Sequence, residues 1–155
     1  MMDTPFRLPP IVPHLVVNRG GDAIDFYARA LGAELMSRLD NGEGLVMNAG
    51  LTINGAAVML NDHFPGMSPP PPQPGHSAVT IHLTVDNADR WFDRAVAAGA
   101  TPAMPPADMF WGDRYAVVHD PFGHSWAFAH NLHGHQLGHD EINSNFAAFK
   151  EGAMQ

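Results

Sequence analysis

The chain of 155 residues contains no cysteine and a single lysine, Lys150. Without cysteine, disulfides, thiolate metal ligands and cysteine nucleophiles are excluded. The formal net charge of −8 argues against nucleic acid or an anionic membrane surface as a partner, because both are bound through clustered Lys and Arg. No apolar run approaches the length of a signal peptide core or a membrane span. We therefore expect a soluble, cytoplasmic protein that binds neither nucleic acid nor membrane.

The sequence repeats one pattern twice. The segment PHLVV (13–17) recurs as IHLTV (81–85), which places His14 and His82 in register, 68 residues apart. Each copy leads into an amphipathic helical stretch, and INGAAVML (53–60) is echoed by FGHSWAFA (122–129) at the same offset between Gly55 and Gly123. This duplication predicts an α+β fold built from two βαβββ modules.

Turn residues and periodicity divide the chain into five parts. We expect an N-terminal arm over 1–10, a first module over 11–61, a proline-rich linker over 62–76, a second module over 77–130, and a tail over 131–155. Strands are predicted at 11–17, 34–39, 44–53, 56–61, 77–85, 101–105, 114–119 and 125–130, and helices at 23–33, 87–98 and 141–151.

The helix end FYARALGAE (26–34) and the string MFWGDRYAVVHDPFGHSWAFAH (109–130) resemble the vicinal-oxygen-chelate superfamily. This group includes glyoxalase I, bleomycin-resistance proteins, fosfomycin-resistance enzymes and extradiol dioxygenases, and the chain is most similar to PhnB-like, glyoxalase-like proteins. The resemblance spans residues 9–131. It implies modules whose strands curve into a half-open sheet around a cavity, usually completed in a dimer, so we expect a homodimer. It implies no particular substrate, because one fold supports many chemistries.

The resemblance also implies where a metal would bind. It assigns the ligand positions to Val12, Met59, Thr80 and Ala127, none of which is a histidine or glutamate. A divalent cation needs several nitrogen or oxygen donors. We therefore expect no metal at the usual site and no other cofactor.

His14 and His82 lie two residues beyond two of these positions, so strand alternation puts them on the same side. They could hold a displaced divalent metal, transfer protons to a ligand, or only pack the modules together.

Other side chains are candidates for a ligand site. Strand alternation groups Tyr115 with Val117 and His119, and the resemblance turns this group toward the cavity. Asn48 is a polar residue in an apolar strand, and Phe110 and Trp111 precede a strand at the expected rim. The small residues Ala127 and Ala129 would leave space, whereas Trp126 and Phe128 are expected to pack against a helix. The candidate ligand-binding residues are His14, Asn48, His82, Phe110, Trp111 and Tyr115.

Three further features receive structural interpretations. Asp120 in DPFG is expected to set a turn through bonds to its own backbone. Asp113 and Arg114 are expected to form a local ion pair or a loop hydrogen bond. The tail histidines His130, His133, His135 and His139 can collect adventitious zinc or nickel.

Two main functions remain open, beside a third option in which the protein acts only by interaction through its dimer surface and tail. The first is binding of a small, mainly apolar molecule between paired modules without the usual metal. The alternative is a lyase or isomerase in which His14, His82 and Tyr115 transfer protons or a displaced metal acts. The sequence assigns no catalytic residue.

Overall fold

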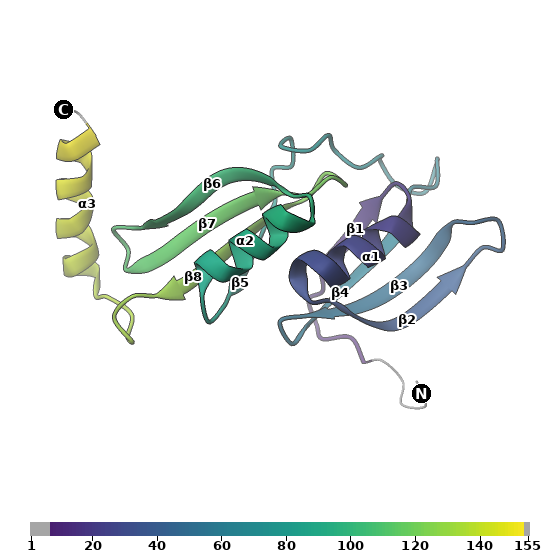
Figure 1. The fold of residues 1–155 in the computed structure, drawn as a ribbon, viewed down its shortest axis with the longest axis horizontal. Coiled ribbons are helices and arrows are strands. Elements are labelled where there is room, and N and C mark those ends of the chain that lie inside the picture. Colours follow the sequence, from purple (N-terminus) through teal and green to yellow (C-terminus); the bar gives the residue numbers. More distant parts are fainter. Residues whose placement is uncertain (1–6, 154–155) are drawn as a thin grey trace.

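A computed structural model describes residues 7–153 and contains two four-stranded sheets with three helices (Figure 1). The first module comprises β1 (His14–Val17), α1 (Gly20–Leu31), β2 (Glu34–Asp40), β3 (Val46–Ile53) and β4 (Ala56–Asp62). The second comprises β5 (Thr80–Thr84), α2 (Ala88–Ala98), β6 (Thr101–Asp108), β7 (Asp113–His119) and β8 (Ser125–Asn131). Helix α3 (His139–Ala153) follows.

The two sheets have the same topology. Strand order is β1-β4-β3-β2 in the first and β5-β8-β7-β6 in the second. In each, the first strand pairs parallel to the last and the other neighbours pair antiparallel. The predicted α+β fold of two βαβββ modules is confirmed, and the sheets lie side by side without closing into a barrel (Figure 1).

Helix α1 begins at Gly20, three residues before the predicted start. Arg19 is the N-cap residue but makes no side-chain cap bond. The carboxylate of Asp62, at the end of β4, instead accepts the Gly20 N–H at 2.9 Å and the Val46 N–H at 2.8 Å. A long-range carboxylate therefore stabilises the first turn, where free N–H groups favour negative charge. The helix ends before Gly32, which adopts the expected left-handed conformation with φ 65°.

Helix α2 starts in a comparable way. The Asn87 side chain accepts the Arg90 N–H at 3.0 Å, and the Ala88 N–H donates to Nδ1 of His130 at 2.8 Å. Ala88 and His130 stand 68 residues after Gly20 and Asp62, so the repeat preserves the contact and changes the acceptor. The ring of His130 therefore has a structural role, because it accepts a hydrogen bond at the start of α2.

Strand β6 extends to Asp108, beyond the predicted end at Pro105. It contains Pro102, Pro105 and Pro106 and lies at the edge of its sheet. Proline cannot donate to a ladder, but an edge strand needs bonds on one side only. The pairing with β7 shifts register between Pro102 and Met104 and again before Ala107, which accommodates the prolines.

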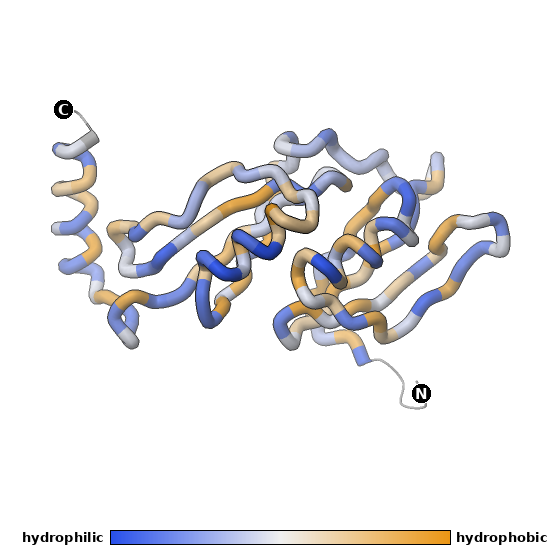
Figure 2. The backbone as a smooth tube through the Cα atoms, in the orientation of Figure 1, coloured by the Kyte–Doolittle hydropathy of each residue, from blue (hydrophilic) through white to orange (hydrophobic). Residues whose placement is uncertain are grey.

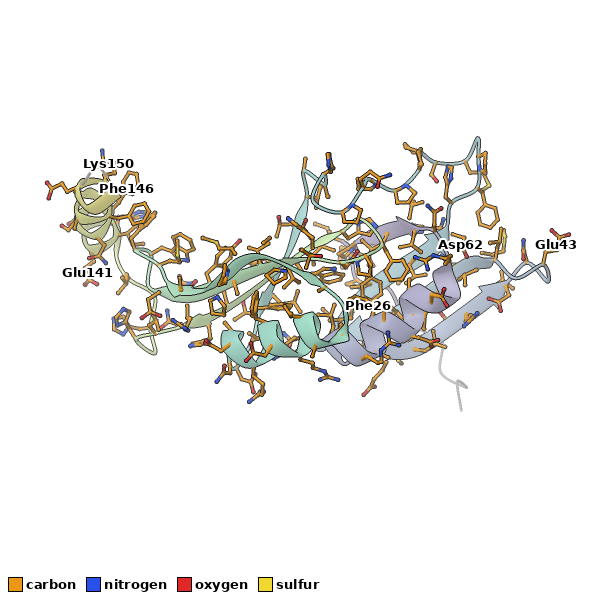
Figure 3. All side chains as sticks on the ribbon, turned by 45° about the horizontal axis from the view of Figure 1, so that its top comes forward. Phe26, Glu43, Asp62, Glu141, Phe146 and Lys150 are labelled. Atoms are coloured by element: carbon orange, nitrogen blue, oxygen red, sulfur yellow. The ribbon has the colours of Figure 1, made fainter. Side chains whose placement is uncertain are left out.

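The hydrophobic core lies between the helices and the covered faces of the sheets. The apolar stripe of α1 is buried, and the tube in Figure 2 shows the alternation of apolar and polar segments in both helices. Phe26 sits at the junction of the two modules (Figure 3). The helices are also joined by Arg94, whose Nε–H donates to the carbonyl of Arg29 at 2.8 Å.

Asp120 joins the two modules. Its carboxylate, 1% exposed, accepts the Phe122 and His124 N–H groups and so sets the DPFG turn as expected. It also accepts the hydroxyl of Tyr27 from α1 at 2.6 Å and Nε1–H of Trp126 at 2.8 Å. The rings of Tyr27 and Trp126 pack against each other, and Phe26 and Phe122 pack on Tyr27.

The linker passes over the same turn. Gly123 has φ 106°, and a Cβ atom placed on it would lie 2.1 Å from the carbonyl oxygen of Pro72. The close approach of linker and turn therefore requires glycine.

Beyond the second module, α3 begins two residues before the predicted tail helix and stands at the far end of the molecule (Figure 1). Within residues 7–153, no helix is long and apolar enough to cross a membrane.

Replacing Gly123 by alanine should lower the free energy of unfolding by about 3 kcal/mol, because the methyl group overlaps Pro72 and φ is positive. Urea denaturation measures this. Gly55→Ala is the matched control, since Gly55 has φ 80° and open space around it. It should cost about 1 kcal/mol. Equal losses in the two variants would show that the linker contact contributes nothing.

Burial and the neighbouring Asp120 carboxylate raise the pKa of Tyr27 well above its usual value. An unfolded tyrosine ionises near pH 10, so above that pH the unfolded state loses a proton that the folded state keeps. This group should therefore lower the free energy of unfolding by about 1.4 kcal/mol per pH unit above pH 10. Tyr27→Phe should remove that part of the slope in denaturation curves recorded between pH 8 and 11. An unchanged slope would contradict the prediction.

Candidate ligand-binding site

Each sheet has one face covered by its helix and one uncovered face, which we call the open face. In β1, Leu15 and Val17 are buried under the helix and His14 is exposed on the open face. In β5, Leu83 is buried and His82 is exposed. Alternation adds Asn48 to the open face of the first sheet and Tyr115 to that of the second. The four strand candidates are thus divided between two sheets that lie side by side.

His14 is oriented by a residue that the sequence did not single out. Its Nε2 contacts Oδ1 of Asn61 in β4, and the Asn61 amide donates to the carbonyl of Asp62 at 2.8 Å. Because that amide must donate, its oxygen faces His14, so Nε2 of His14 carries the proton. Nδ1 then remains as the acceptor that a ligand could use. The sequence carried little signal for Asn61, because it stands next to Asp62 at the end of an otherwise apolar strand.

His82 and Tyr115 form a stacked pair across β8. Their ring centroids are 5.9 Å apart at 28° between planes, although β8 separates their strands. Two strand spacings amount to about 9.5 Å, so both rings lean over β8. Ala127 and Ala129 pair with His82 and Tyr115 and lie buried beneath. These small residues therefore make room for the stack itself.

An aromatic row continues from Tyr115. Trp111 packs edge-on against Tyr115 at 5.4 Å, and Phe110 packs against Trp111 at 5.1 Å. Phe110 also contacts Phe146 and Phe149 of α3, so it anchors the tail helix. Trp126 and Phe128 lie on the covered face as predicted, and Phe128 packs against Trp91 of α2.

A cavity of about 590 Å³ lies between the two modules, and we call it the seam cavity. Its walls are mostly apolar and come from the N-terminal arm, the β3–β4 hairpin, β5 and β8. The lining residues are Arg7, Pro9, Ile11, Pro13, Thr52, Ile53, Gly55, Ala56, Ala57, Val58, Ile81, His82, Leu83 and Trp126. Of the six predicted ligand residues, His82 lines this cavity. No pattern in the sequence had pointed to the arm and hairpin residues as part of a ligand site.

The charged residues beside the aromatic row differ from expectation. Arg114 and Asp113 point to opposite faces of β7, and the predicted pair between them is replaced. Arg114 donates from Nε and Nη2 to Asp89 of α2 at 2.6 and 2.9 Å, and from Nη1 to Asp108 at 2.8 Å. These hydrogen bonds lower the pKa of Asp89 and raise that of Arg114. The reason for the difference is that adjacent strand residues alternate faces.

A family model for the Glyoxalase/Bleomycin resistance protein/Dioxygenase superfamily matches residues 7–128. The chain belongs to this superfamily. It is 43% identical over 148 residues to the uncharacterized protein Rv0887c of Mycobacterium tuberculosis, covering 93% of this chain and 86% of that protein.

Solved structures of the superfamily share the fold. The crystal structure of TioX from Micromonospora sp. ML1 superposes with a TM-score of 0.64 at 30% identity, covering 79% of this chain and 98% of that one. A PhnB protein from Bacillus cereus superposes with a TM-score of 0.60 at 19% identity, covering 79% and 99%. At that identity the second likeness shows the fold alone.

Four residues of this chain occupy the positions assigned to metal ligands in the superfamily. Met59 pairs with His14, and Ala127 pairs with His82. Of Val12, Met59, Thr80 and Ala127, only Thr80 offers an oxygen donor, so these four residues do not fit a divalent cation. Among residues 7–153, no group of three or more His, Asp or Glu side chains is arranged to hold a metal ion.

Proposed function

We propose that this protein binds a small, mainly apolar molecule in the seam cavity between its modules and does so without the metal usual in its superfamily. The supporting observation is the cavity itself, whose volume of about 590 Å³ falls in the range typical of ligand sites. Its lining is mainly Pro, Ala, Ile, Val and Leu, so burial of apolar surface would supply most of the affinity. His82 and Arg7 are its main polar contacts.

His82 is suited to orient such a ligand. Its side chain is exposed, and among the described residues no hydrogen-bond partner for its ring is present. Stacking on Tyr115 restricts the ring without using either nitrogen. Each nitrogen can therefore bond a polar atom of the ligand.

The same observation favours a second candidate, proton transfer in a lyase or isomerase. His82 could accept a proton from a bound molecule while the adjacent Tyr115 donates a hydrogen bond. His14 lies on the other sheet, so in this candidate it would act from the neighbouring module or from a second copy of the chain. Turnover that is abolished by His82→Ala while ligand affinity is retained would distinguish this candidate from simple binding.

Filling the seam cavity should block binding. We expect Ala57→Trp to weaken the binding of 3-methylindole at least tenfold in isothermal titration calorimetry, because the half-buried Ala57 side chain lines the cavity. The matched control, Ala97→Trp, adds the same bulk on the exposed surface of α2 and should leave the affinity unchanged.

Equal affinities in the two variants, or no binding to the unmodified protein, would contradict the proposed function. Elemental analysis of untagged protein tests the proposed absence of a metal. One transition metal ion retained per chain would contradict that part, and His14 and His82 would be the first ligands to replace.

We also propose a homodimer. Leu39, which pairs with Asn48 on the open face of the first sheet, is 63% exposed, and helices α1 and α2 cover only the opposite faces of the two sheets. Because the sheets are repeats of each other, the first sheet of one copy can cover the second sheet of another in a closed two-fold arrangement. That arrangement would bring the His14 face of one copy over the His82 face of the other.

Light scattering at micromolar concentration should therefore give twice the chain mass of 16.8 kDa. Leu39→Glu, which puts a charge on the open face, should shift the mass toward that of one chain. Arg29→Glu on α1 is a control for added negative charge. A single-chain mass for the unmodified protein would show that the open faces remain uncovered.

A further inference from the structure

A second, polar cavity adjoins His82 on the open face of the second sheet. Its volume is about 410 Å³, and its polar walls come from β5, β7, β8 and the tail. The polar lining residues are His82, Thr84, Asp113, His130, Asn131, His135 and Gln136. The superfamily match ends at residue 128. One wall of this cavity is therefore supplied by a segment outside the part of the chain that the superfamily shares.

The tail wall is held firmly against the module. Oδ1 of Asn131 accepts the N–H groups of His133 and His135 at 2.9 and 3.0 Å, which closes the chain into a tight turn. The Leu132 N–H donates to the carbonyl of Gly112 at 2.9 Å. A Cβ atom on Gly112 would lie 2.9 Å from Cγ of Leu137, so the tail packs directly on the loop before β7.

Helix α3 adds a second anchor for this segment. The Asn145 amide donates to the carbonyl of Phe110 at 3.1 Å, and Phe146 packs on the Phe110 ring at 4.9 Å. Figure 3 shows Phe146 on α3 at the end of the second module. The segment 131–137 is thus attached to the module at both ends, and Asn131, His135 and Gln136 line the cavity from a preorganised backbone.

Asp113 is the charged group of this cavity. It is half-buried, and the one hydrogen bond to its carboxylate among the described residues comes from the Asn131 amide at 3.4 Å. The neighbouring Arg114 lies on the opposite face and is engaged by Asp89 and Asp108. A carboxylate left in a partly enclosed site without a cation favours a positively charged ligand group.

His82 lines both this cavity and the seam cavity. We infer that residues 131–137 and Asp113 form a polar subsite for the ammonium group of a ligand whose apolar part occupies the seam cavity. The inference rests on the proposed function and adds the ligand class: a small apolar amine. Asp113 binds the ammonium group, Gln136 contributes a side-chain carbonyl, and Asn131 acts as a positioning residue for the tail turn.

Three indoles that share one ring system test this inference at pH 7. Tryptamine carries an ammonium group, 3-methylindole is neutral and indole-3-acetate is an anion. Calorimetry with the full-length protein should show tryptamine binding about tenfold more tightly than 3-methylindole, and indole-3-acetate most weakly. Asp113→Asn should abolish the preference for tryptamine and leave the affinity for 3-methylindole unchanged.

Two further variants separate the subsite from overall charge and from folding. Asp93→Asn removes the same charge from an exposed position on α2 and should preserve the preference. Gln136→Ala should weaken tryptamine alone. If 3-methylindole binds and the preference is missing, or if Asp113→Asn retains it, this inference is wrong and the proposed function stands. If none of the indoles binds, both are wrong.

Discussion

The arrangement of the two modules depends on one buried carboxylate. Asp120 accepts four hydrogen bonds, two from its own turn, one from Trp126 and one from Tyr27 of the first module. A buried charge without such donors would be strongly unfavourable, so the turn and helix α1 must meet at this point. The seam cavity exists because the modules are joined here and at the helices, whereas the facing edges, β1 and β5, share no backbone ladder.

The repeat conserves geometry more closely than chemistry. At the start of α1 the acceptor is the carboxylate of Asp62, and at the equivalent place in α2 it is the imidazole of His130. Both satisfy an N–H group that a helix cannot satisfy internally. The same logic applies to the open faces. His14 is oriented by Asn61, whereas its counterpart His82 stacks on Tyr115.

A segment beyond the superfamily match contributes to the candidate site. The tail turn, which follows residue 128, walls the polar cavity beside His82, whereas the arm residues that line the seam cavity lie within the match. A common scaffold that carries a chain-specific segment at its edge is one way in which a fold serves different ligands. The aromatic row from Tyr115 to Phe110 connects the open face of the second sheet to α3, so the tail helix supports the candidate site.

The sequence by itself determined the two βαβββ modules, because a 68-residue echo and amphipathic periodicity are local signals. It also placed His14, Asn48, His82 and Tyr115 on strand faces, since alternation needs no tertiary information. Tertiary structure alone decided which of them meet. It divided the histidines between two sheets, paired His82 with Tyr115 over small alanines, and sent Arg114 to Asp89. Those outcomes depend on how sheets and segments that are distant in the sequence pack together. Hydrophobic periodicity does not predict that packing.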